Sequence, residues 1–482
     1  MAVATITLVS SNGDSAVVSA PNDTFLDEEI ILDTDPKGLY ATGFKVRTQS
    51  GAFEPGGRIV GEQVPIREMV LPFWLTQASR RRFQKMWGTP GNFQKVRYIY
   101  DGPSGPRALT LRLAKEIEFT TDGGFDADID DEYHAVVSAI AVDPNFESPE
   151  DVSSWVNPDD RFTLGVVASG GTFPLTFGGK TTTVFTVGIV ATGGTFPLTI
   201  GGQTATGIPY NASIAAVTSA LEALPSVGAG NVTVIGTPGA YFIAFTTVTG
   251  TLTSSTASLT GSGKAVNITS GVPWNASPAV LKSALESLSS VGVGKVGVAG
   301  TPATASTPGS YSIVFAVGTN GVLTSSAANL IGVGLFSATK SVTISYAPNT
   351  GWFDVWNPTD QALWNEWELD PAEQWQFPDF AFGQERKWGR TVGQDAARMI
   401  VTPKLTKLLS VMSDPFMDTY VNADLSNAAG LFNGVEPLYM VPPYTGTDED
   451  PVVMPVICRG PAGSKVTLRQ RRFWSAESGL EQ

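Results

Sequence analysis

The sequence predicts a mainly β protein: an N-terminal β-barrel or sandwich domain with one helix, a duplicated small α+β repeat module as an insert, and a C-terminal β-sandwich. Fifty-one Gly and 32 Pro among 482 residues favour short strands and turns over long helices. A segment repeats itself within residues 163–346, which indicates a duplicated module. Six of the eleven tryptophans lie between residues 352 and 388, followed by several strand-like segments. At about 150 residues per domain, roughly three domains are expected.

The N-terminal domain is expected over residues 1–149, and its sequence is typical of β-strands with one exception. Residues 67–75 predict a strand, and residues 76–87 predict an amphipathic helix that carries Phe83 and Trp87 one turn apart. Gly88 supplies the stop signal for this helix. Further hairpins should follow.

Polar, proline-containing text at 150–162 predicts a linker that leads into the insert at 163–346. Within the insert GIPYNAS at 207–213 returns 64 positions later as GVPWNAS at 271–277. Each copy combines a hairpin, a helix capped by Asn-Ala-Ser and two strands. We therefore expect two similar α+β lobes side by side, with copies at about 193–260 and 261–335.

The C-terminal β-sandwich is expected over residues 347–482. Two short matches, WVNPDD at 155–160 and WNPTD at 356–360, flank the insert and fit its insertion into an existing loop.

Charge is distributed unevenly. The net charge is −14, and the insert contributes +3 from five Lys and two Glu, which leaves −17 for the rest. This acidity argues against nucleic-acid binding through broad electrostatics. The insert has no Asp and only two Glu, both in the polar face of the repeat helix, which argues against catalysis there. No run of about 18 apolar residues predicts a membrane span.

Motifs for catalysis or metal binding are weak. His134, the only histidine, stands in an alternating strand pattern, and Cys458, the only cysteine, lies in an apolar run that suggests burial. The glycine pattern at 292–297 resembles a dinucleotide-binding loop, but it falls between a helix and a strand, in the reverse of the required order. We expect no catalytic residue, no cofactor-binding residue and no metal site. Acidic runs at 27–29, 122–132 and 448–450 look like solvated faces.

Two groups of residues are candidates for recognition. The first is a basic cluster on the expected helix that suits assembly, by pairing with acidic faces such as 27–29 on a neighbouring copy; it comprises Arg80, Arg81, Arg82 and Lys85, with Trp87. The second is a set of tryptophans that suits either a subunit interface or stacking against sugar rings; it comprises Trp352, Trp356, Trp364 and Trp367.

Several segments resemble the distal tail proteins of long-tailed bacteriophages, often called minor tail proteins in phages of actinobacteria. The resemblance covers the N-terminal and C-terminal thirds; its segments are 67–87, 139–146, 355–360, 364–369, 375–380, 439–444 and 468–475. The ending at 475–481 departs from the tryptophan-rich ending typical of such proteins. The insert resembles Gly/Thr-rich modules of phage structural proteins, a less specific match.

The resemblance implies a homo-hexameric ring at the tail tip of the virion, with the N-terminal domain building the ring. The implied partners are the tail tube protein, the baseplate hub or tail-tip protein and the tape measure protein, with no cofactor and no reaction. Two alternatives stay open: an adhesin that binds host cell-wall glycan through the insert or the tryptophan-rich domain, and a polysaccharide hydrolase.

Overall fold

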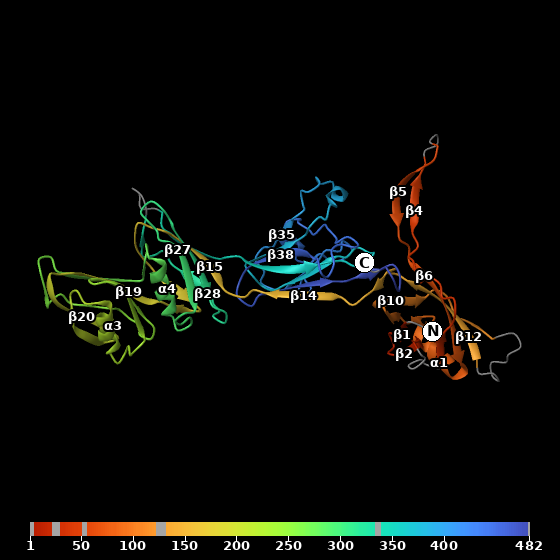
Figure 1. The fold of residues 1–482 in the computed structure, drawn as a ribbon, viewed down its shortest axis with the longest axis horizontal. Coiled ribbons are helices and arrows are strands. Elements are labelled where there is room, and N and C mark those ends of the chain that lie inside the picture. The colour runs from red at the N-terminus through yellow and green to blue at the C-terminus, as the bar shows by residue number, and fades with distance from the viewer. Residues whose placement is uncertain (1–3, 22–28, 51–54, 122–131, 333–338, 481–482) are drawn as a thin grey trace.

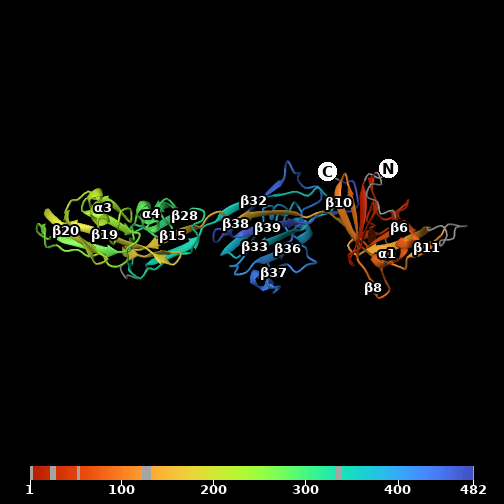
Figure 2. The same ribbon diagram turned by 90° about the horizontal axis from the view of Figure 1, so that it is seen from below.

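The computed structural model describes residues 4–21, 29–50, 55–121, 132–332 and 339–480. The fold is mainly β, as the sequence predicts, with many antiparallel sheets. Figures 1 and 2 show an elongated chain of bodies in a row: the N-terminal domain at one end, the C-terminal sandwich in the middle and the insert at the other end. We call these the N-terminal domain, the middle domain and the insert.

The N-terminal domain is a curled sheet in the order β2-β1-β9-β10-β12-β6-β3. Its end strands β2 and β3 lie against each other, so the sheet encloses one core. Its elements are β1 (Thr5–Ser10), β2 (Ser15–Ser19), β3 (Ile30–Leu32), β6 (Arg67–Thr76), α1 (Gln77–Trp87), β7 (Gly88–Thr89), β8 (Asn92–Phe93), β9 (Val96–Gly102), β10 (Gly105–Leu113), β11 (Glu118–Thr120), β12 (Glu132–Ala141) and β13 (Phe146–Glu147).

The predicted strand and helix at 67–87 are confirmed. Strand β6 alternates buried with half-exposed or exposed residues, as period-two patterning requires. The hydroxyl of Thr76 accepts the Ser79 backbone N–H at 3.2 Å and caps α1. Phe83 and Trp87 then turn the apolar face of α1 into the barrel core.

A two-stranded ribbon leaves the barrel between β3 and β6. Its strands are β4 (Lys45–Gln49) and β5 (Arg58–Gln63), which pair only with each other among the described residues. Figure 1 shows this ribbon, which we call the arm, projecting from the N-terminal domain.

The middle domain is a sandwich of two antiparallel sheets, β14-β39-β33-β36-β37 and β32-β38-β34-β35, which share one core. Its elements are β14 (Asp151–Val156), β32 (Asn349–Val355), β33 (Asn365–Leu369), β34 (Gln374–Pro378), η2 (Glu385–Trp388), β35 (Met399–Val401), β36 (Leu409–Met412), β37 (Tyr420–Asn422), η3 (Ala429–Phe432), β38 (Val452–Arg459) and β39 (Lys465–Gln470).

The expected linker at 150–162 is not a linker. Strand β14 forms an edge of the middle domain by pairing with β39 along its whole length, and the indole of Trp155 lies edge-on to that of Trp375. The edge position of β14 leaves its residues partly exposed, which explains why this segment is polar. The chain end also departs from expectation, because β40 (Phe473–Trp474) pairs with β13 and returns to the N-terminal domain.

The insert forms two similar lobes, and one is nested inside the other. The outer lobe comprises β15 (Arg161–Val167), β16 (Gly170–Phe173), β17 (Leu175–Phe177) and β18 (Lys180–Thr181), then β26 (Val272–Pro273), α4 (Pro278–Glu286), β27 (Val296–Thr301), β28 (Gly309–Phe315), β29 (Leu323–Ser325), β30 (Leu330–Ile331) and β31 (Ser341–Tyr346). The inner lobe comprises β19 (Thr183–Val190), β20 (Gly193–Ile200), β21 (Gln203–Pro209), α3 (Ile214–Glu222), β22 (Val232–Thr237), β23 (Ala240–Phe245), β24 (Leu259–Thr260) and β25 (Ala265–Ser270).

Equivalent strands pair in the same order in both lobes, β27-β28-β15-β31 in the outer and β22-β23-β19-β25 in the inner. The boundaries therefore differ from the expected copies at 193–260 and 261–335, because the inner lobe interrupts the outer one between β18 and β26. Long-range pairing of β15 with β28 and β31 decides this division.

Candidate assembly surfaces

The basic cluster of α1 is divided between the barrel wall and solvent. The guanidinium of Arg80 lies 4.7 Å from the ring centre of Phe119 and 4.8 Å from that of Tyr133, in cation–π geometry. Arg82 donates to the backbone oxygen of Ser15 at 2.5 Å. Arg81 and Lys85 are exposed. Arg81 and Lys85 are therefore the members of the cluster best placed for recognition.

Trp87 does not belong to that surface. Its side chain is fully buried in the barrel core, with its ring centre 6.4 Å from that of Phe83. Phe83 and Trp87 lie one helical turn apart, and this spacing already favours an inward position for both side chains. The burial of Trp87 corrects the expectation that it takes part in an interface.

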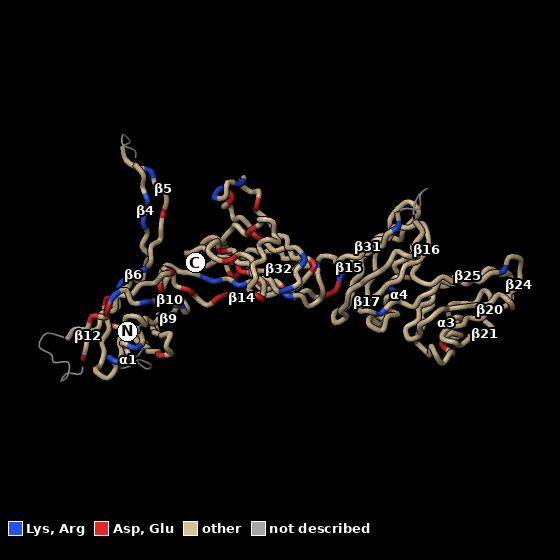
Figure 3. The backbone as a smooth tube through the Cα atoms, turned by 180° about the vertical axis from the view of Figure 1, so that it is seen from behind, with Lys and Arg blue, Asp and Glu red and all other residues tan. Residues whose placement is uncertain are grey.

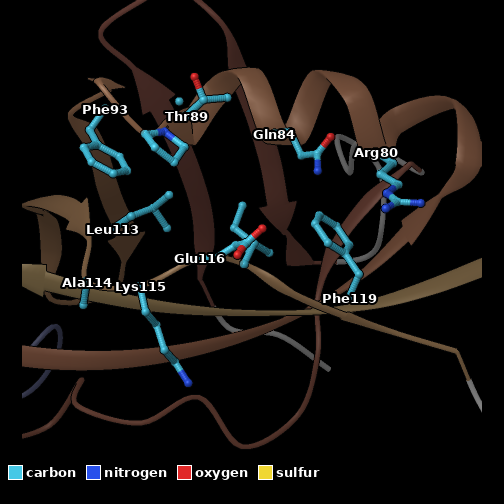
Figure 4. A pocket seen from close by; sticks show the side chains of 12 residues that line it. Arg80, Gln84, Thr89, Phe93, Leu113, Ala114, Lys115, Glu116 and Phe119 are labelled. Atoms are coloured by element: carbon cyan, nitrogen blue, oxygen red, sulfur yellow. The ribbon is translucent and has the colours of Figure 1, made fainter.

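A cleft of about 400 Å³ lies beside α1. Figure 4 shows Arg80 and Gln84 on the helix, with Leu113 and Phe119 among the side chains that line the cleft. Phe93 also lines it and is 53% exposed, so the cleft has an apolar wall open to solvent.

The four candidate tryptophans occupy different environments. Trp352 is 62% exposed on the outer face of β32. Trp356 is half-buried under the guanidinium of Arg472, which lies 3.9 Å from its ring centre, and Trp364 is also half-buried. Trp367 is fully buried in the sandwich, so a role in glycan or partner contact is corrected for that residue. Its two-residue spacing from buried Leu369 in β33 is the sequence signal for this inward position.

The two sequence matches that flank the insert, 155–160 and 356–360, form the same local structure twice within the middle domain. In each, which we call a clasp, a buried asparagine side chain binds backbone oxygens of a neighbouring loop. The side chain of Asn157 donates to the oxygens of Gly460 and Pro461 at 2.9 and 3.0 Å. Asn357 donates to the oxygen of Pro442 at 2.9 Å and is also fully buried. Each asparagine therefore fixes a proline-containing loop of the middle domain, a role that the short sequence matches do not reveal.

The aspartates that end these matches reach neighbouring bodies. Asp160 accepts the backbone N–H of Ala462 in the middle domain at 2.6 Å and that of Gly321 in the insert at 3.0 Å. Asp360 accepts the N–H of Ser475, in the returning chain end, at 3.0 Å. The carboxylates therefore bridge the middle domain to both of its neighbours.

The returning chain end is held by buried polar groups of the N-terminal domain. Arg107 donates to the oxygens of Ala476 and Gly479 at 2.9 and 2.8 Å, and its guanidinium lies 3.7 Å from the ring centre of Trp474. The hydroxyl of Tyr98 donates to Glu477 at 2.7 Å. Burial raises the pKa of Glu477. These contacts attach the C-terminal segment of the chain to the N-terminal domain.

Arg67, at the start of β6, completes this attachment. It donates to the oxygens of Pro144 and Gly38 at 2.6 and 2.8 Å, and it also contacts the oxygen of Ser475. Burial lowers the pKa of Arg67 to about 10.

The described residues define the surroundings of the single histidine and the single cysteine of the chain. Within those residues no group of three or more His, Cys, Asp and Glu could hold a metal ion. His134 lies against Trp74 with ring centres 3.5 Å apart, and its Nδ1 is 3.6 Å from Asp33. Cys458 is buried, and burial raises its pKa to about 12. Across the described ranges, no helix is both long and apolar enough to cross a bilayer.

The acidic partner expected at 27–29 lies outside the described residues except for Glu29, and most of the run at 122–132 lies outside them as well.

No protein-family model matches the chain, and no curated protein matches it. Its structural neighbours are phage hub and baseplate proteins. The chain is similar to the SPP1 Dit protein, described as a paradigm of the hub adsorption apparatus in phages that infect Gram-positive bacteria, with 14% identity, 39% of this chain and 70% of that chain covered, and a TM-score of 0.23. It is also similar to a chain in two structures of the phage P2 baseplate in its activated conformation. The identity is 8% in the structure with calcium and 7% in the structure with strontium, and each match covers 98% of both chains at a TM-score of 0.31.

Proposed function

We propose that the chain is a structural virion protein, the distal tail hub of a long-tailed phage of actinobacteria. In this role six copies form a ring at the tail tip that joins the tail tube protein to the baseplate hub or tail-tip protein, with the tape measure protein as a further neighbour. The resemblance of segments in the N-terminal and C-terminal thirds supports this assignment.

The return of the chain end to the N-terminal domain is the observation that favours a scaffold most strongly. The chain leaves the barrel through β13 and β14, passes through the middle domain and insert, and comes back at β40. Arg67, Arg107 and Tyr98 then fasten its last described residues. Two chain crossings and a buried polar attachment resist relative movement of the two domains, as a connector under load requires.

The distribution of ionisable groups supports a role without catalysis. The insert has few charges, and Figure 3 shows its backbone with only scattered acidic or basic positions. The buried aspartates Asp160 and Asp379 accept backbone N–H groups, so their carboxylates serve the fold.

Sedimentation velocity and negative-stain microscopy of the full chain test this proposal. The expected result is closed rings of six copies, and gold-labelled antibody against the chain should mark one end of the tail of the phage that encodes it. A chain that stays monomeric at all accessible concentrations, with antibody that does not mark tails, would overturn the proposal.

A second function, adhesion to host cell-wall glycan, is favoured by the exposure of Trp352. Its indole stands on an open sheet face near Val453 and Pro455 of the neighbouring strand β38. Aromatic rings on flat exposed faces suit stacking against sugar rings. Purified cell-wall polysaccharide should sediment the full chain, and Trp352→Ala should weaken this. The same truncation at another exposed indole, Trp388→Ala, should leave it unchanged. Equal binding by all three proteins argues against adhesion through this face.

A further inference from the structure

Among the residues that the structure describes, none covers the two faces of the arm. All described residues of β4 are exposed, as are all of β5 except Gly61. Phe44 is 74% exposed and Ile59 is 66% exposed, on a ribbon of only two strands. An isolated two-stranded ribbon is marginally stable in water, and its outer edges offer unpaired backbone groups. A ribbon of this composition is stabilised when it lies on a partner.

The charge of the arm indicates the kind of partner. Its described strands contain Lys45, Arg47 and Arg58 against Glu62, so they are basic in a chain whose net charge is −14. The side chain of Arg47 reaches Gln63 across the ribbon at 2.8 Å and stays exposed. The arm therefore suits a surface that combines apolar and acidic groups.

The outer face of β3, β6 and β12 has this combination. Cross-strand register places Ile31, Trp74 and His134 in one row, and Pro72 opposite Val136 in the next. All five are half-buried, so this face of the sheet is only partly covered. A cavity of about 300 Å³ opens at the Thr76 end of β6.

Acidic residues surround that apolar face. Glu68 and Glu132 stand at its two ends on exposed positions of β6 and β12, and Asp33 lies beside His134. Glu29 and Glu132 both line the cavity together with Ile31 and Trp74. Lys37, whose backbone pairs with Val70, is an exposed cation on the same side. Figure 3 shows basic positions along the arm and acidic positions beside β12.

We propose that the arm of one copy lies on this acidic face of a second copy. A second copy fits as the occupant because the arm is basic with exposed apolar residues, while the face is acidic with half-buried apolar residues. The inference rests on the proposed ring, and it names the contact that holds neighbouring copies together.

The arm and the cavity lie at opposite ends of β6, since β5 leads into Arg67 and the cavity opens at Thr76. At about 3.3 Å per residue the ten-residue strand separates them by roughly 30 Å. Two different surfaces of the chain then meet in each contact. Such head-to-tail contacts close into rings when the rotation between copies allows it.

Charge reversal with rescue tests the contact on the full chain. Arg47→Glu with Arg58→Glu reverses two charges of the arm, and Glu68→Lys with Glu132→Lys reverses two charges of the face. Each double variant should weaken self-association about tenfold or more by sedimentation velocity at low salt. The chain that contains all four changes should recover self-association, because opposite charges again face each other. Lys180→Glu with Lys295→Glu, at exposed positions of the insert, is the matched control.

The outcomes separate this inference from the proposed function. If the unchanged chain forms rings and arm reversal leaves them intact, the arm contact is overturned and the ring proposal stands. If arm reversal weakens the rings but the fourfold variant does not recover, the acidic face is not the partner, and the inference is again overturned. If the unchanged chain does not self-associate, both fall. Circular dichroism and the unfolding midpoint of each variant should match the unchanged chain, since all four residues are exposed.

Discussion

Asn157 and Asn357 make the same clasp at two boundaries of the middle domain, one with the insert and the other with the N-terminal domain. Both are fully buried, and both exchange backbone hydrogen bonds with the loop that their side chains hold: the N–H of Asn157 donates to Ser464 and that of Asn357 to Thr445, each at 2.8 Å. Similar sequence at the two junctions thus reflects one local structure used twice.

Replacing either asparagine with alanine should destabilise the middle domain by about 1–3 kcal/mol, because buried carbonyl oxygens lose their donors. Urea unfolding followed by tryptophan fluorescence measures this loss. Asn320→Ala, at an exposed position of the insert, should change the free energy of unfolding by less than about 0.5 kcal/mol. Equal effects at the three positions would contradict the clasp.

Tyr241 and Tyr311 should contribute equally to the two lobes. Their hydroxyls donate to the backbone oxygens of Ala212 and Ala276 at 2.6 and 2.7 Å, which are the equivalent alanines within the two Asn-Ala-Ser caps. Replacing either with phenylalanine should cost about 1 kcal/mol by removing one buried hydrogen bond. The double variant should show an additive loss in thermal unfolding if the lobes are independent. A large loss for one tyrosine alone would show that the lobes are not equivalent.

Truncation to alanine should destabilise the protein strongly at Trp87 and hardly at all at Trp352. Trp87→Ala leaves a cavity in the barrel core and should cost about 3–5 kcal/mol of stability. Trp352→Ala removes an exposed side chain and should change stability by less than about 0.5 kcal/mol. Differential scanning calorimetry of the full chain compares them. A stable Trp87→Ala variant would place that indole outside the core.

Glu477 should make the attachment of the chain end sensitive to pH. Burial raises its pKa in the folded chain, while the Tyr98 hydrogen bond opposes that rise. Because the folded pKa lies above the unfolded value, the stability from this group is fully present below the unfolded pKa and is lost as the pH rises through the folded pKa. Glu477→Gln, which keeps an acceptor for Tyr98, should flatten this part of the dependence of unfolding on pH.

Urea midpoints measured across the acidic range check the effect of Glu477. Glu449→Gln, at an exposed carboxylate of the middle domain, should retain the slope of the unchanged chain. If Glu477→Gln retains the same slope as well, the buried carboxyl does not titrate with folding.

Local signals made α1 predictable and left the environment of the tryptophans undecided. Thr76, the apolar spacing of Phe83 and Trp87, and Gly88 together define the helix within one short segment. The same spacing places the side chain of Trp87 in the core. The clustering of six tryptophans between residues 352 and 388 does not by itself show which of them are buried. Trp352 is adjacent to buried Phe353 and points the opposite way, whereas Trp367 stands two residues from buried Leu369 and shares its face, so strand periodicity distinguishes them.

The nesting of the lobes was beyond sequence reasoning for a different reason. Repeated text shows that a unit was copied, but it does not show which strands pair. The outer lobe is closed by β15 with β31, whose residues are about 180 positions apart, as the Thr163 to Ser345 pair shows. The same long-range pairing turns the expected linker into β14 and returns β40 to the barrel.

The sequence by itself determined the mainly β character, the helix after β6 and the presence of two related α+β units, because period, capping and repetition are local properties of the chain. The tertiary structure alone decided that one lobe lies within the other, that residues 151–156 form an edge strand of the middle domain, and that the basic arm and the acidic face belong to one domain. Those features depend on strand pairing and burial between distant segments, which close only when the whole chain has folded.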